Sequence, residues 1–200
     1  MGIKASIYSV FPFFYLFIYM IRLKEILFEQ EASNKKKIDP TTKVAAQKKI
    51  IQQVANKIDT MKLGSPIADF LVHIAAVESC YGLNPRAGKN VWQVDPIAFK
   101  DTQNIKSHPN LKEKYKILKK AGIDWPTKSY NDIKNNMLLN GIAARLYLAN
   151  QPGSIPADLK GQAQYWKSNY NTAAGAGGVN DFIIKNSDGG LKGCTGYVQS

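Results

Sequence analysis

Cysteine and histidine are scarce in this chain of 200 residues, and their scarcity argues against a metal centre. Cys80 and Cys194 are the only cysteines, and they lie far apart without the spacing of a metal-binding motif. His73 and His108 are equally isolated, so a zinc site would need mostly carboxylate ligands, which is uncommon. We therefore expect no metal and no cofactor. Two cysteines allow a single disulfide without requiring one, and we expect free thiols.

The sequence also lacks the alternation of apolar and polar residues that is typical of half-buried strands, and it has no internal repeat. Apolar residues instead recur at helical spacing, which predicts a mainly α fold. The helices are expected at residues 42–62, 66–79, 110–122, 131–150 and 156–170, with one more short helix after them. Ser65 is expected to cap the second of these helices, and Asn131 or Asp132 the fourth.

These patterns divide the chain into four parts. Residues 1–28 are expected to form a hydrophobic segment, residues 29–42 a charged linker, and residues 43–185 the main helical domain. Residues 186–200 are rich in glycine and predict a poorly ordered tail.

Acidic residues are few: 15 Asp and Glu face 27 Lys and Arg, which gives a net charge of +12. The excess is spread over both halves of the chain. Such a charge favours a polyanionic partner, and nucleic acid, an acidic lipid surface and a cell-wall polymer all qualify.

Charge is absent from residues 5–21, although Lys4, Arg22 and Lys24 flank them. An uncharged apolar run of this length is near the lower limit for a helix that spans a bilayer, about 17–25 residues. No small-x-small cleavage pattern follows it, so we predict an uncleaved membrane anchor rather than a signal peptide. More positive charge follows the run than precedes it, which favours a cytoplasmic domain and opposes a function outside the membrane.

Glutamate is rare after residue 64, where only Glu78 and Glu113 occur. Glu78 follows the apolar residues 70–77, and helical steps back from it reach Ile74 and Ile67 on the stripe that packs into the core. A carboxyl group that loses hydration has a raised pKa. A raised pKa suits a general acid near neutral pH, as in glycosidases. An exposed glutamate at a helix end would show the same pattern.

Three segments in order resemble the lytic transglycosylases of the soluble, goose-lysozyme-like type. They are "ES" at residues 78–79, "NVWQVDP" at residues 90–96 and "NYNTAAGAG" at residues 169–177. In that family a Glu-Ser at a helix end is followed by a Gly-Leu-Met-Gln-Val-like turn, and later by Ala-Tyr-Asn-Ala-Gly. The helix "NNMLLNGIAARLYLA" also resembles one in the family. The resemblance covers about residues 50–182 and implies that residues 43–185 form a catalytic domain with a lysozyme-like fold.

The chain departs from the family pattern at two positions of the second segment. Asn90 stands where the family usually has glycine, and asparagine tolerates a left-handed backbone. Trp92 replaces a smaller apolar residue and is expected to form a wall on which a sugar stacks. The chain between residues 96 and 131 is also longer and more basic than the family pattern.

The resemblance implies a role for each matching residue. Glu78 would protonate the glycosidic oxygen between N-acetylmuramic acid and N-acetylglucosamine. It would then take the proton of the muramoyl 6-hydroxyl, which closes a 1,6-anhydro ring. Tyr170 would hydrogen-bond Glu78 and orient it, and Ser79 would support the loop beside the substrate. Gln93 and Asn171 would contact the sugar or its N-acetyl group.

Other functions remain open on the sequence alone. A hydrolase of the same fold needs a second carboxyl group, about 6.5–9.5 Å from the first if it inverts, and Asp95 and Asp101 are the nearest candidates. A silent wall-binding module or a nucleic-acid-binding protein would also be basic. The "GAGG" at residues 175–178 lacks the context of a phosphate-binding loop, which argues against a nucleotide site. The segment "QYWKSNY" at residues 164–170 mixes aromatics with a lysine, as single-strand nucleic-acid platforms do. At helical spacing such aromatics favour core packing or sugar stacking, so we expect no nucleic acid. Peptidoglycan strands are the expected partner, in the cell envelope or on a virion.

Overall fold

A computed structural model describes residues 39–200 except 88, 172–174, 176, 188 and 199–200. The described chain is mainly α-helical and contains no strand, which confirms the predicted class. The predicted anchor at residues 5–21 and most of the linker lie outside the described residues. No helix within residues 39–200 is long and apolar enough to cross a membrane.

The first described helix, α2 (Pro40–Thr60), begins where local chemistry favours a helix start. The Asp39 carboxylate accepts the Thr42 amide hydrogen at 3.1 Å, and Pro40 occupies the first turn, where no N–H partner is needed. The predicted helical stripe is confirmed, and its fully buried members are Val44, Ile51, Ala55 and Ile58. Residues 40–42 belong to this helix, so the linker ends earlier than predicted.

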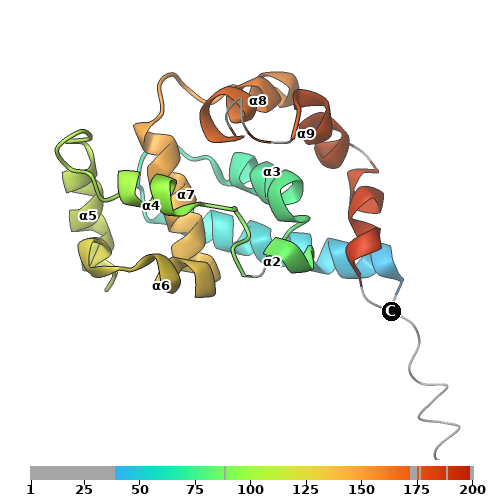
Figure 1. Cartoon of the computed structure of the whole chain (residues 1–200), viewed down its shortest axis with the longest axis horizontal. Helices are drawn as coiled ribbons and strands as arrows, with labels where there is room; N and C mark the ends of the chain where they lie inside the picture. The colour runs from blue at the N-terminus through green and yellow to red at the C-terminus, as the bar shows by residue number, and fades with distance from the viewer. Residues whose placement is uncertain (1–38, 88, 172–174, 176, 188, 199–200) are drawn as a thin grey trace, which may run out of the picture. The chain divides into compact units, whose positions relative to one another are not determined.

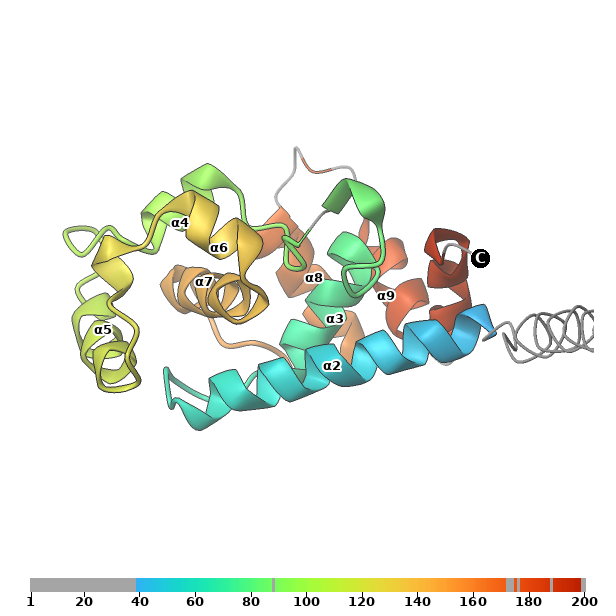
Figure 2. The same ribbon diagram turned by 90° about the horizontal axis from the view of Figure 1, so that it is seen from below.

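Helix α3 (Ala68–Ser79), which carries Glu78, lies at the centre of the fold. Figures 1 and 2 show it between α2 and the pair formed by α8 (Leu159–Trp166) and α9 (Val179–Asn186). Its apolar residues are buried on several sides because neighbours surround it, which explains its nearly continuous apolar sequence.

The sequence predicted that Ser65 caps the start of α3, but a residue of α2 does so instead. The Asp59 carboxylate accepts the Ile67 and Ala68 amide hydrogens at 2.9 and 2.7 Å. Asp59 lies in the last turn of α2, so this cap also ties the two helices together.

The chain between the second and third segments of the resemblance forms short helices at one end of the molecule (Figure 1). They are α4 (Pro96–Asp101), α5 (Leu111–Lys120) and α6 (Tyr130–Asn135), which lead into α7 (Met137–Asn150). The basic helix α5 ends before Gly122, which has a left-handed backbone, as predicted.

The predicted helix at residues 131–150 is two helices. Asn136 adopts an extended backbone between α6 and α7, and its side chain accepts the Leu139 amide hydrogen at 3.1 Å to cap α7. Asparagine favours such local bonds over the helix interior, which explains the break. The cap of α6 is Ser129, in a capping box with Asp132, rather than Asn131 or Asp132 itself.

Residues 190–197 are folded onto the domain, which corrects two predictions. The 3-10 helix η4 (Gly190–Tyr197) contacts α2 and α9, although residues 186–200 were expected to form a poorly ordered tail. Its buried Cys194 forms a disulfide with Cys80, so the expectation of free thiols is wrong. Their sequence separation of 114 residues gave no signal, because only the fold brings η4 to the end of α3.

We expect the disulfide to stabilise the domain substantially, because it closes a long loop and restricts the unfolded chain. Cys194→Ser should lower the free energy of unfolding by about 2–4 kcal/mol. Urea unfolding followed by circular dichroism would measure the loss. The variant should no longer respond to a thiol reductant, whereas the wild type should lose stability in it. A wild type of equal stability with and without reductant would contradict this prediction.

Candidate active site

The carboxyl group of Glu78 lies in the last turn of α3, where the chain turns sharply. Cys80, Tyr81 and Gly82 follow in succession with left-handed backbones, so the helix stops one residue after Glu78. Glu78 is half-buried, and its Oε1 accepts a hydrogen bond from Trp166 Nε1 at 2.9 Å. Trp166 itself is buried at the end of α8.

Burial raises the pKa of Glu78 to about 7, in spite of two opposing influences. The Trp166 hydrogen bond and the positive charge of Lys185 both lower it, but by less than burial raises it. Lys185 is held near the helix end because its Nζ donates to the Val77 carbonyl at 3.0 Å. The raised pKa expected from the sequence is confirmed, and the group can carry or release a proton near neutral pH.

Ser79 is only 1% exposed and joins the helix end to the following loop. Its hydroxyl donates to the Val91 carbonyl at 2.6 Å and accepts the Gly82 amide hydrogen at 2.8 Å. These bonds agree with the loop-supporting role that the resemblance implied. A side chain so deeply buried is not placed to contact a substrate.

A buried polar network holds the loop that contains Trp92. Asn140 of α7 accepts the Trp92 amide hydrogen at 3.0 Å and donates to Asn90 Oδ1 at 2.6 Å. Asn90 in turn donates to the Val94 carbonyl at 3.0 Å. The left-handed residue of this loop is Gln93 and not Asn90, whose side chain is occupied by the network.

Trp92 cannot serve as the predicted sugar-stacking wall in this structure. Its side chain is 0% exposed, and its Nε1 donates to the Leu71 carbonyl at 2.8 Å. Both faces of the indole therefore lie in the core. Gly141 of α7 leaves room for the ring, since a Cβ there would lie 3.1 Å from Trp92 Cη2.

Tyr170 lies near Glu78 without forming the predicted hydrogen bond to it. Its hydroxyl donates to the Trp92 carbonyl at 2.6 Å, so it fixes the loop instead. The two groups still interact: burial first and then the Glu78 charge raise the pKa of Tyr170 well above its usual value. The hydrogen-bond partner of Glu78 is Trp166, which the sequence did not single out for this role.

Gln93, Tyr170 and Asn171 line one cavity of about 470 Å³, so the structure brings three of the predicted site residues together. The Gln93 amide donates to the Asn90 carbonyl, and Asn171 Nδ2 donates to the Gly177 carbonyl at 2.9 Å. Both side chains are therefore partly committed to protein groups. Glu78 does not itself line this cavity.

Both candidate second carboxylates border the same cavity. Asp95 is exposed and caps α4, accepting the Ala98 amide hydrogen at 2.7 Å. Asp101 is half-buried; it lies 2.8 Å from His108 Nε2 and accepts from Asn150 Nδ2 at 2.9 Å. Asp101 is thus part of a polar cluster rather than of an open solvated face.

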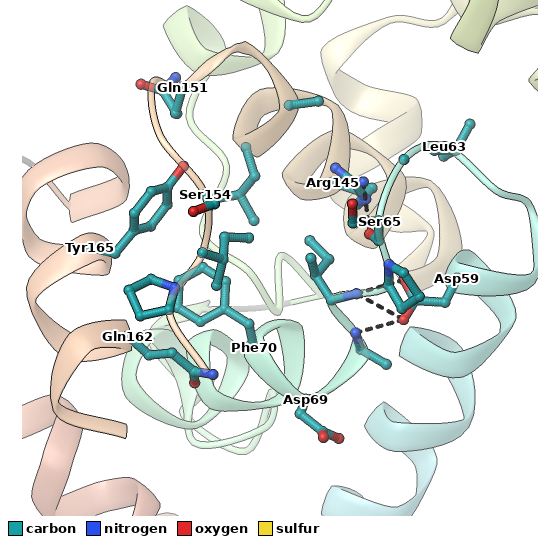
Figure 3. Close-up of a pocket in the computed structure, with 18 of the residues that line it drawn as sticks. Asp59, Leu63, Ser65, Asp69, Phe70, Arg145, Gln151, Ser154, Gln162 and Tyr165 are labelled. Carbon is teal, nitrogen blue, oxygen red and sulfur yellow. Dashed lines mark hydrogen bonds between the residues drawn. The ribbon is translucent and has the colours of Figure 1, made fainter. Parts of the chain in front are cut away.

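A larger cavity of about 890 Å³ lies at the other end of α3, next to Ala68 and Asp69 (Figure 3). Glu78 lies ten residues after Ala68 along the helix, which is a rise of roughly 15 Å. The larger cavity therefore does not lie beside the carboxyl group with the raised pKa. We place the candidate active site at Glu78, because that is where an acidic group with a shifted pKa lies beside the residues of the three segments.

Comparisons with protein-family models, with curated proteins and with solved structures found no match to this chain. Among the residues that the structure describes, no three His, Cys, Asp or Glu side chains are grouped so that they could hold a metal ion.

The structure adds residues that the sequence did not single out. Trp166 and Lys185 both act on the Glu78 carboxyl group from helices far along the chain, and Asn140 anchors the loop opposite it. Trp166 was expected only to be a core or stacking aromatic. The packing of α8 and α9 on α3 decides these contacts.

The raised pKa of Glu78 should make the stability of the domain depend on pH. Between about 4.5 and 7 the folded protein holds a proton that the unfolded chain releases, so stability is full below 4.5 and falls as the pH rises through 7. Glu78→Gln should remove this decline and, above pH 7, raise stability by an amount on the order of 3 kcal/mol. Urea unfolding at several pH values would measure it.

The matched control is Glu113→Gln, because Glu113 is the only other glutamate after residue 64 and is exposed on α5. This variant should keep the wild-type dependence on pH. If Glu78→Gln and the wild type lost stability in parallel between pH 4.5 and 7, the assignment of the raised pKa would be wrong.

Proposed function

We propose that the domain has a lysozyme-like fold and cleaves the β-1,4 bond between N-acetylmuramic acid and N-acetylglucosamine in peptidoglycan. The observation that carries this proposal is the half-buried Glu78, whose pKa of about 7 suits a general acid that protonates the leaving oxygen. The fold supports it indirectly, because α2, α8 and α9 hold α3 and leave its last turn beside the loop at residues 90–94.

The reaction we propose is that of a lytic transglycosylase. Neutral Glu78 gives its proton to the glycosidic oxygen as the bond to the anomeric carbon breaks. The resulting carboxylate takes the proton of the muramoyl 6-hydroxyl, whose oxygen forms the new bond to the same carbon. The muramoyl residue supplies its own nucleophile and the N-acetylglucosamine leaves with the protonated oxygen, so one carboxyl group suffices. The Trp166 hydrogen bond would stabilise the carboxylate between the two steps.

The neighbouring cavity supports a place for the sugar. Gln93, Tyr170 and Asn171 line it together with Tyr147 and Gln151, and amide and hydroxyl groups suit N-acetyl and hydroxyl substituents. The net charge of +12 would help hold an anionic wall. The disulfide supports a location outside the reducing cytoplasm, in the cell envelope or on a virion.

Glu78→Gln should abolish cleavage, because an amide cannot donate the proton. We expect the rate of release of soluble muropeptides from purified peptidoglycan to fall about 10²- to 10⁴-fold, while sedimentation with the wall is retained. Mass spectrometry of the wild-type products should show 1,6-anhydro ends. Glu113→Gln, with the same chemical change on exposed α5, should cleave at the wild-type rate.

Wild-type activity should also decline as the pH rises through about 7, where Glu78 loses its proton. A Glu78→Gln variant that cleaves normally would refute its role as the acid. If the wild type bound peptidoglycan but released nothing, the domain would be a binding module.

A hydrolase of the same fold is the second candidate, because Asp101 borders the cavity within a polar cluster. In a hydrolase, Asp101 would position a water molecule, and the products would carry reducing ends rather than 1,6-anhydro rings. We expect Asp101→Asn to leave the product type unchanged and the rate within about tenfold of wild type, because the proposed reaction needs no second carboxylate. Reducing ends that disappear in this variant would establish the hydrolase instead.

A further inference from the structure

The 890 Å³ cavity beside the start of α3 plays no part in the proposed glycan chemistry. It is bounded by the end of α2, the start of α3, α7 and the loop that joins α7 to α8 (Figure 3). Its volume is within the range of small-molecule sites, about 300–1,000 Å³. Its lining combines apolar groups with charged and amide side chains.

The most unusual lining residue is Arg145 of α7, which is only 6% exposed. Its Nη2 donates to the Ser65 carbonyl at 3.1 Å, and this is the one hydrogen bond that the Arg145 side chain makes to the described residues. No carboxylate of the described chain lies within 4.0 Å of the guanidinium. Gly64 makes room for it, since a Cβ there would collide with Nη2.

The Asp59 carboxylate, which acts electrostatically on Arg145, is already occupied by other donors. Both oxygens of Asp59 accept amide hydrogens at the start of α3, so this carboxylate interacts with Arg145 only at longer range. Lys114 of α5 adds a second, half-buried cation to the lining. Burial lowers the pKa of both Arg145 and Lys114, and the Arg145 charge lowers that of Lys114 further.

A buried charge is normally paired, because leaving it without a counterion is costly. Arg145 has unused N–H donors and faces a cavity large enough for a ligand, so an anion entering that cavity would supply the missing partner. A planar carboxylate matches the fork of a guanidinium.

The rest of the lining narrows the class of ligand. Asp59 and Asp69 also border the cavity, and their charge disfavours a multiply charged anion such as a phosphate. Asp69 is exposed and could pair with an amino group. Figure 3 shows Ser154 and Tyr165 on the wall across from Arg145, where they can hydrogen-bond amide groups.

We propose that this cavity binds a short peptide through its free carboxylate, with Arg145 as the principal carboxylate ligand and Lys114 assisting. The inference stands on the cavity alone and does not depend on glycan cleavage. In a protein that acts on peptidoglycan, such a site would hold a peptide attached to, or released from, the wall.

The test compares alanyl-alanine, which has a free carboxylate, with its C-terminal amide, using the full chain. Nuclear magnetic resonance titration should show saturable shifts of the Gly64 and Ser65 amide signals with the free dipeptide. The amide derivative should bind at least about tenfold more weakly, because it loses a charge-assisted hydrogen bond. No saturable shift with the free dipeptide, or equal affinity for the two, would overturn the proposal.

Three variants test whether the dipeptide binds beside Arg145. Arg145→Gln should weaken binding of the free dipeptide at least about tenfold, and Lys114→Gln should weaken it less. Lys116→Gln is the matched control on the same helix, because Lys116 is exposed and paired with Glu113, and it should bind normally. Unchanged affinity in both Arg145→Gln and Lys114→Gln would also overturn the proposal.

Two further variants keep the test independent of folding and of catalysis. Ser154→Phe places a large side chain at an exposed position of the rim, so it should block binding even if Arg145→Gln does not fold. Normal binding in Ser154→Phe would place the dipeptide elsewhere and contradict the proposal. Glu78→Gln should bind the dipeptide normally, so that a loss of glycan cleavage is distinguished from a loss of this site.

Discussion

The loss of hydration at the Glu78 carboxyl group is the constraint on which the proposed activity depends. A glutamate at a helix end is ordinarily exposed and ionised at neutral pH. Here helices packed beside α3 bury the carboxyl group and also bring Trp166 and Lys185 to it, both of which favour its ionised form. Burial outweighs these two favourable partners, so the group stays poised between its neutral and ionised forms. If the Glu78 carboxyl group were less buried, its pKa would be close to that of an ordinary glutamate.

The surroundings of Glu78 are held by polar contacts that are themselves buried. Ser79 ties the helix end to the loop, Asn140 holds that loop from α7, and Tyr170 bonds the Trp92 carbonyl. A satisfied buried network has few alternative arrangements, since breaking any one bond leaves a polar group without a partner. The position of the loop relative to Glu78 is therefore fixed by hydrogen bonds that do not involve the carboxyl group itself.

Helix α3 has different electrostatics at its two ends. At its start, Asp59 satisfies the free amide groups, which leaves the nearby buried Arg145 without a close carboxylate. At its other end, a left-handed turn and a disulfide at Cys80 follow the last helical residue, Ser79. One central helix thus separates the half-buried Glu78 carboxyl group from the cavity that Arg145 lines.

The sequence by itself determined the features that depend on neighbours along the chain. The helical stripe of α2 and the stop at Gly122 follow from side-chain spacing and local backbone preference. The spacing placed Glu78 at the edge of an apolar stripe but fitted an exposed glutamate equally well, and the packing of other helices decided its burial. Local preference was wrong at Asn136, whose side chain competes with the backbone for a hydrogen bond, and at Ser65, whose place as the cap of α3 is taken by Asp59.

The tertiary structure alone decided the contacts between distant segments. Cys80 meets Cys194 across 114 residues, Trp166 meets Glu78 across 88, and the Trp92 amide meets Asn140 across 48. Periodicity describes which face of a helix is apolar, but it does not say which other helix covers that face. The partners of a residue are set by how whole helices pack, and that packing is a property of the entire core.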